Sequence, residues 1–233
     1  MSGCREVAAF CLAHESNAMT LSKILSWLVM LLVPPAIVLG VVRLMLTPLF
    51  IQVEYRTPNF PPDVFGFTTA DRLHWADISR QYLLNNAGID FLAEQRLPDG
   101  SPLYNARELR HMADVKRVVK AALTVWYGVL ALLVLLGLAA YRSGQWAAYR
   151  RGLAWGGWLT IGLMLAVVVL AVVAFQTLFV DFHRVFFEGD TWLFNYSDSL
   201  IRLFPERFWR DAFVLLGGLS LLLGRALALL GRK

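Results

Sequence analysis

Cysteine is scarce in this chain of 233 residues. Only two cysteines are present, Cys4 and Cys11, and both lie close to the N-terminus. Their spacing matches no metal-ligand motif, and the rest of the sequence offers them no partner. The sequence therefore argues against a disulfide framework and against a cysteine nucleophile in the body of the protein.

A strong excess of charge is also lacking. Lysine and arginine number 22 against 17 acids, and the resulting net charge of +5 is too small to indicate nucleic-acid binding. No nucleic-acid-binding motif is present, so we expect no nucleic-acid partner. The HExxH motif and comparable metal-ligand spacings are missing as well, which argues against a zinc hydrolase of that kind.

Apolar residues, in contrast, are abundant. They make up 58% of the chain, compared with about 45–50% in an ordinary soluble domain. The excess is concentrated in four runs, at residues 24–51, 118–141, 153–180 and 212–230. A helix of about 20 residues crosses a hydrocarbon core of about 30 Å. We predict an all-α membrane protein with four transmembrane helices.

The distribution of charge predicts the orientation of these helices. Three arginines and no acid lie between the second and third runs, the chain ends in Gly-Arg-Lys, and Lys23 precedes the first run. Residues 52–117 and 181–211 hold 15 of the 17 acids. Basic flanks favour the cytoplasmic side. We expect a cytoplasmic segment at 1–23, one membrane domain at 24–230 and a cytoplasmic tail at 231–233, with both acidic segments outside.

The two acidic segments are expected to form a mostly helical extracytoplasmic cap. Thr68 and Asp71 have the spacing of a capping box, which predicts a helix that starts there and ends near residue 85. Pro98-Asp99-Gly100 predicts a small hairpin. Residues 105–119 have a helical pattern that continues into the second run, and Pro205 is typical of the first turn of a further helix.

Ionisable residues gather where two of the runs leave the membrane. Glu108, His111 and Asp114 are three residues apart, so neighbouring pairs can meet on one helix surface. His111 precedes the second run by seven residues, which is roughly 10 Å of helix. His183 follows the third run by three residues. We therefore expect both histidines at a similar depth, in one shared cavity.

Other interpretations of these residues remain open. Interfacial histidines, arginines and aromatic residues often do no more than anchor helix ends, which applies to His183 and to Arg43. His111 could belong to a solvated helix face. His74, beside Trp75, is more typical of a surface or packing residue.

Several blocks of the sequence resemble a known family. They are "ELRHMADVK" at 108–116, "FHRVFF" at 182–187 together with Trp192, and "LIRLFPERFW" at 200–209. In type and order they are similar to the blocks of the lipoprotein intramolecular transacylases, within a wider group of four-helix integral membrane proteins of bacteria. The resemblance extends over roughly residues 24–225, and its two histidine blocks are its most specific part.

The resemblance implies an acyltransferase in the bacterial cell membrane. Such an enzyme moves the sn-2 acyl chain of an S-diacylglyceryl-cysteine lipoprotein onto the α-amine of the same cysteine. The product is an N-acyl S-monoacylglyceryl lipoprotein. The implied partners are the diacylated lipoprotein and membrane lipids, and neither a cofactor nor a metal is implied. By block matching, His111 and His183 are the functional histidines.

The chemistry of the reaction suits these side chains. An α-amine has a pKa of about 7.7–8.0, so a histidine could take its proton and return one to the leaving alcohol. A carboxylate could fix the tautomer of His111, and a nearby donor could stabilise the oxyanion. The candidates for orienting a histidine or stabilising the oxyanion are Glu108, Asp114, Arg43, Trp192 and Tyr196. Which histidine is the base and which the electrophile stays open.

Two other functions compete with this one. The first is a membrane metallohydrolase or lipid hydrolase that uses His74, His111 and His183. The second is a non-enzymatic receptor or chaperone, for which the two acidic segments would be the binding surface.

Overall fold

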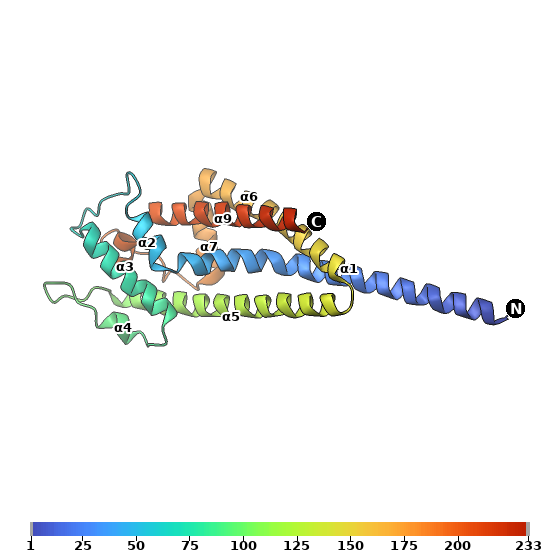
Figure 1. Ribbon diagram of the computed structural model, residues 1–233. Coiled ribbons are helices and arrows are strands. Elements are labelled where there is room, and N and C mark those ends of the chain that lie inside the picture. Colours follow the sequence, from blue (N-terminus) through green and yellow to red (C-terminus); the bar gives the residue numbers. More distant parts are fainter. Residues whose placement is uncertain (1, 232–233) are drawn as a thin grey trace. The chain divides into compact units, whose positions relative to one another are not determined.

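The computed structural model describes residues 2–231, and for residues 2–18 it describes the backbone only. The expectations for Cys4 and Cys11 therefore lie outside the described side chains. Figure 1 shows the helices that make up the described chain. Their bounds are α1 Ser2–Met45, α2 Pro48–Glu54, α3 Thr69–Leu84, α4 Asp90–Ala93, α5 Ala106–Arg142, α6 Trp146–Val173, α7 Phe175–Phe186, α8 Ser199–Leu203 and α9 Glu206–Leu230.

Four of these helices are long and apolar enough to cross a membrane. They are Met19–Met45 of α1 and the whole of α5, α6 and α9. The prediction of an all-α membrane protein with four membrane helices is confirmed.

Two of the four apolar runs are divided, which the sequence analysis did not predict. The first run breaks at Thr47, whose extended backbone precedes Pro48 at the start of α2, because proline disfavours a helical residue before it. The third run breaks at Ala174, so His183 lies on a separate helix, α7. Aromatic side chains of α7 pack on α9, with Phe182 and Phe213 rings 5.8 Å apart. In Figure 1, α7 runs across the direction of α9.

The described chain forms two compact units. One combines the chain up to Val38 with Trp126–Met164 and the segment from Leu219 onward. The other combines Leu39–Val125 with Leu165–Gly218, and it holds both candidate histidines.

In the first unit, α6 packs closely on α1 through glycines. An added Cβ at Gly152 would lie 2.7 Å from the carbonyl oxygen of Ser26. An added Cβ at Gly156 would overlap Val33 and lie 2.9 Å from the carbonyl oxygen of Met30. Such small residues let two membrane helices approach backbone to backbone. Val29 and Val33 fill the resulting interface and are fully buried.

We expect Gly156→Ala to lower the thermal unfolding temperature of the purified protein in detergent, because its methyl group would push α6 away from α1. Gly162→Ala is the matched control, since an added Cβ there meets nothing within 4 Å. Alanine is the better helix former by about 1 kcal/mol, so the control should unfold at the same temperature or slightly higher. Equal unfolding temperatures of Gly156→Ala and Gly162→Ala would contradict the close packing of α6 on α1.

The second unit contains the predicted capping box. The Thr68 side chain accepts from the amide of Asp71 and the Asp71 carboxylate accepts from the amide of Thr68, so α3 begins where the sequence predicts. The expected hairpin, however, is reduced to one bridge between Arg96 and Pro102. Pro102 has no amide hydrogen with which to extend the pairing.

A core of aromatic and aliphatic side chains holds α3, α5 and α8 together in this unit. Its buried members are Tyr82, Leu92, Leu103, Tyr104, Met112, Leu200 and Leu203. A buried polar anchor supplements this core, because the Lys116 ammonium donates to Asn85 and to the carbonyl oxygen of Ala87. The core fixes the first turns of α5, where His111 lies.

Candidate active site

The two histidines that the sequence singles out lie side by side. His111 comes from the second turn of α5 and His183 from α7, and their ring centroids are 6.0 Å apart with an angle of 20° between the planes. Each side chain belongs to a residue that is only 8% exposed. The structure therefore places them in one buried cluster, as the sequence analysis expects from their similar depth.

Aromatic rings surround the pair. Phe187 contacts both histidines, with centroid distances of 4.8 Å to His111 and 5.5 Å to His183. Phe194 lies 5.3 Å from His111, and Phe179 lies 4.1 Å from His183. The sequence analysis did not single out these phenylalanines. The signal was present, because Phe179, His183 and Phe187 are four residues apart and so share one helix face.

A backbone contact defines the tautomer of His183. Its Nδ1 lies 2.7 Å from the carbonyl oxygen of Phe179. A carbonyl only accepts, so Nδ1 is assigned as the donor and the neutral ring keeps its lone pair on Nε2. The Nδ1 atom of His111 is buried and has no partner among the described residues. Each ring thus retains a nitrogen that a substrate could engage.

The environment of His183 also affects its protonation. Burial lowers the pKa of His183, and the hydrogen bond to Phe179 opposes this only in part. Desolvation disfavours the charged imidazolium. The neutral ring, which is the form able to accept a proton, therefore persists to lower pH than in an exposed histidine.

The Glu108 carboxylate is hydrogen-bonded to backbone amides and not to His111, the partner that the spacing suggested. One carboxylate oxygen accepts from the Asn105 amide and the other accepts from the Leu200 amide, each at 2.7 Å. The Asn105 side chain accepts in turn from the Glu108 amide, which completes a capping box at the start of α5. Asp114, the other expected carboxylate, pairs with Arg117. Neither acid is hydrogen-bonded to His111 among the described residues, although the Asp114 charge acts on its ring.

The remaining candidates lie in different surroundings. The Trp192 indole N–H donates to the carbonyl oxygen of Gly189 at 3.2 Å, so it is not free for an oxyanion, although its ring packs 4.8 Å from that of His183. Tyr196 is 82% exposed. Arg43 makes no contact with either histidine within the described part of the chain.

The side chains that could bind a metal ion are scattered. No group of three histidine, cysteine or acidic side chains among the described residues could hold a metal ion. His74 packs against Trp75, with ring centroids 4.5 Å apart, and makes no ring contact or hydrogen bond with the histidine pair in the described part of the chain.

Fold and site together define a class: an integral membrane protein with a buried histidine pair suited to proton transfer. The model of the family "lipoprotein intramolecular transacylase Lit" matches residues 24–209. The chain belongs to this family, whose members are acyltransferases.

Individual proteins are similar to this chain in sequence or in fold. An uncharacterised protein of Aquifex aeolicus is 32% identical over 198 residues, which cover 84% of this chain and 88% of that protein. The fold is similar to that of the lipoprotein intramolecular transacylase of Bacillus cereus, with a TM-score of 0.75, 20% identity and coverage of 91% of this chain and 95% of that one. A histidine-to-arginine variant of that enzyme matches with a TM-score of 0.70, 20% identity and coverage of 97% and 95%.

Proposed function

We propose that this protein transfers the sn-2 acyl chain of a diacylated bacterial lipoprotein onto the α-amine of the same N-terminal cysteine. The substrate supplies both the nucleophile and the ester, so the reaction needs no nucleophilic side chain from the enzyme. The product is an N-acyl S-monoacylglyceryl lipoprotein. The observation that carries the proposal is the histidine pair, in which two buried rings each keep a nitrogen for the substrate.

In the proposed mechanism, His183 is the general base. Its Nε2 takes a proton from the α-amine while the amine nitrogen attacks the sn-2 carbonyl carbon. A C–N bond forms, the ester C–O bond breaks, and the proton goes to the departing glycerol oxygen. The hydrogen bond from Nδ1 to Phe179 holds the ring in the tautomer that this transfer requires.

His111 is proposed to stabilise the oxyanion. With a proton on its buried Nδ1, it donates to the carbonyl oxygen as negative charge develops there, and this interaction is strengthened in a dry site. The rings of Phe187 and Phe194 keep water from that position. Because both reacting groups belong to one molecule, alignment supplies a further large part of the rate.

Mass spectrometry of a lipoprotein N-terminus tests the proposed function. Cells with and without this protein should yield lipopeptides of identical acyl content, and the N-acyl lyso form should be present only when the protein is expressed. Tandem spectra would locate one acyl chain on the cysteine nitrogen. Unchanged S-diacylglyceryl cysteine in both samples would contradict the proposal.

The pH dependence of the rate offers a test of the base. Below the pKa of the substrate amine, about 7.7–8.0, the logarithm of kcat/KM should fall with a slope of one. The slope should increase to two only below the pKa of His183, which burial lowers. Phe187→Ala removes a ring that contacts His183, so the steeper region should begin at higher pH, nearer to about 6.5.

The control for this experiment is Phe186→Ala. Phe186 packs on Phe182, with centroids 4.8 Å apart, and should leave the pH at which the slope changes unaltered. A profile that does not differ between Phe187→Ala and the unmodified enzyme would remove His183 from the role of base.

We also propose the orientation of the chain: both termini cytoplasmic, and the histidine pair on the extracytoplasmic side. The proposal includes one membrane domain at 24–230, and the basic flanks of the apolar runs support the orientation. In a background without Cys4 and Cys11, cysteines at Ser101 and Ser197 should react with an impermeant thiol reagent in intact cells. A cysteine at Ser143 should react only after the membrane is opened. The opposite pattern would reverse the proposed orientation.

A further inference from the structure

A groove of about 220 Å³ lies in the same unit as the histidine pair, but neither histidine lines it. The extended segment before α3 forms one wall, and α8 with its flanking residues forms the other. The lining that matters here consists of Arg72, Arg202, Pro61, Tyr196, Ile201 and Pro205. We refer to it as the Arg72 groove.

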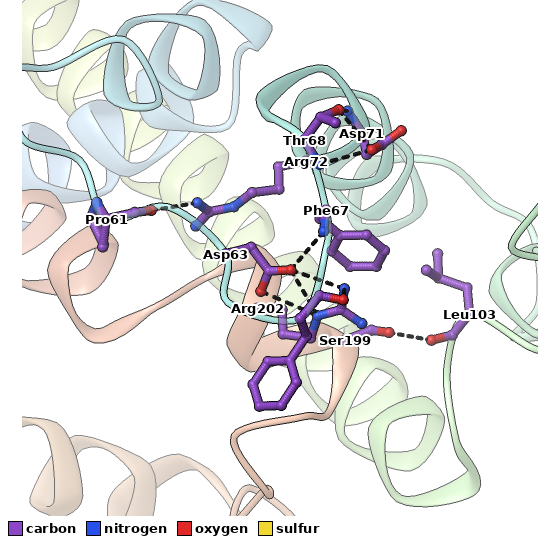
Figure 2. A network of polar contacts seen from close by, with 10 residues as sticks. Pro61, Asp63, Phe67, Thr68, Asp71, Arg72, Leu103, Ser199 and Arg202 are labelled. Carbon is purple, nitrogen blue, oxygen red and sulfur yellow. Dashed lines mark hydrogen bonds and ion pairs between the residues drawn. The ribbon is translucent and has the colours of Figure 1, made fainter.

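One of its two arginines is fully engaged. Arg202 donates to the Asp63 carboxylate, with Nη2 and Oδ2 3.0 Å apart, and to the carbonyl oxygen of Phe65. Its guanidinium also lies 3.5 Å from the ring centroid of Phe67. Figure 2 shows that Asp63 is the centre of this network, and it accepts the Phe67 amide as well. Arg202 and Asp63 therefore neutralise each other.

Arg72 has no such counter-charge. The residue is only 4% exposed. Its Nη1 donates to the carbonyl oxygen of Pro61 at 2.7 Å, toward which the side chain points in Figure 2. Its Nε is buried and has no partner among the described residues. The rings of Tyr55 and Phe60 each lie 4.9 Å from its guanidinium carbon, but neither brings a negative charge, since the Tyr55 hydroxyl keeps its proton and donates it to the carbonyl oxygen of Leu203. Besides Tyr55, the groups that act electrostatically on Arg72 are Asp63 and Arg202, which are already paired with each other.

The groove thus contains one uncompensated positive charge and one unsatisfied buried donor. Both are unfavourable unless a ligand supplies an acceptor with negative charge. A carboxylate is the natural partner, because a guanidinium donates to it in a fork geometry. The volume is below the roughly 300–1,000 Å³ of pockets that enclose a whole small molecule, and it suits a single side chain.

We infer that the Arg72 groove binds an acidic side chain in the peptide of the lipoprotein substrate, downstream of the acylated cysteine. The inference rests on the proposed function and adds a peptide-recognition site to it. Prolines and an exposed tyrosine offer an extended peptide an apolar wall. The groove also connects to the active site through α8, which lines the groove with Ile201 and whose Leu200 amide donates to Glu108 on the helix of His111.

Synthetic diacylated lipopeptides test this inference. Each pair carries glutamate or glutamine at one position after the cysteine, and the purified full-length protein is assayed for the dissociation constant and for turnover. At one position, glutamate should bind about 10-fold or more tightly than glutamine, as for a hydrogen bond to a charged group. The kcat should be the same for both, because the groove does not touch the reacting atoms.

The variant Arg72→Met should abolish the preference for glutamate. Arg96→Met, a change at an exposed arginine outside the groove, should retain it. If Arg72→Met does not fold, the dissociation constants of the glutamate and glutamine lipopeptides for the unmodified protein still show whether an acidic side chain is preferred. Equal dissociation constants at every position would overturn the inference, whether or not the lipopeptides are converted. Conversion is scored separately, so an absence of N-acyl product contradicts the proposed function alone.

A lipid phosphate is the competing ligand. The binding assay is therefore run in vesicles of phosphatidylcholine and in vesicles that also contain phosphatidylglycerol. Arg72-dependent binding that responds to phosphatidylglycerol, without any preference between glutamate and glutamine, would overturn the peptide site in favour of a lipid headgroup.

Discussion

Replacing His183 with alanine is expected to lower the rate of acyl transfer by about 10²–10⁴-fold, the usual contribution of general acid–base catalysis. The variant removes the nitrogen that we propose takes the proton from the amine. His111→Ala should cause a loss of similar size by removing the donor to the oxyanion. The measurement is the ratio of N-acyl to diacyl lipoprotein at matched enzyme levels. Both variants should still insert into the membrane, because neither residue lies in the apolar runs.

Two further variants separate the possible roles. His183→Gln keeps an amide N–H but cannot accept a proton, so it should be as inactive as His183→Ala if His183 is the base. Partial activity of the glutamine variant would instead assign it to the oxyanion. Arg43→Ala should retain near-normal turnover, because Arg43 contacts neither ring in the described structure. Near-normal product ratios in both histidine-to-alanine variants would refute histidine catalysis and favour a receptor.

Much of the architecture follows from the sequence because its signals are local. The length of the apolar runs predicts four membrane helices, and the spacing of Thr68 and Asp71 predicts the start of α3. The separation of α6 from α7 at Ala174 is different, because neither proline nor glycine marks it. It depends on the packing of α7 phenylalanines against α9. Such a contact between distant segments has no local signal.

The candidate site, like the fold, could be predicted only in part from the sequence. The similar depth of the two histidines, together with the histidine blocks of the family resemblance, predicted His111 near His183, although the second histidine lies on a helix that was not predicted. Spacing could not reveal which groups occupy each polar atom. The Glu108 carboxylate satisfies two backbone amides, and the Trp192 indole satisfies the Gly189 carbonyl group. Two candidates are thus engaged by other groups: Trp192 by a carbonyl group three residues away, and Glu108 by a local amide and by the distant Leu200 amide.

Glu108 leads to the second large expected effect, which concerns stability. Its side chain is 1% exposed, and its two oxygens accept the amides of Asn105 and Leu200. Glu108→Ala leaves the buried Leu200 amide without an acceptor, at about 1–3 kcal/mol, and also removes the acceptor of the part-buried Asn105 amide. We expect this variant to unfold at a markedly lower temperature. Glu108→Gln retains one acceptor oxygen and should lose roughly half as much stability. Thermal unfolding in detergent measures both.

The control for Glu108 is Asp114→Ala, six residues further along α5. Asp114 pairs with Arg117, whose side chain is 80% exposed, and exposed pairs contribute only about 0–1 kcal/mol. Its unfolding temperature should hardly change. The Glu108→Gln variant also distinguishes two roles for Glu108. If Glu108 joins α5 to α8, Glu108→Gln is less stable than the unmodified protein, yet its turnover well below the unfolding temperature stays close to normal. If it sets the tautomer of His111 instead, stability is preserved and kcat falls steeply, because a carboxamide holds an imidazole N–H less strongly than a carboxylate does.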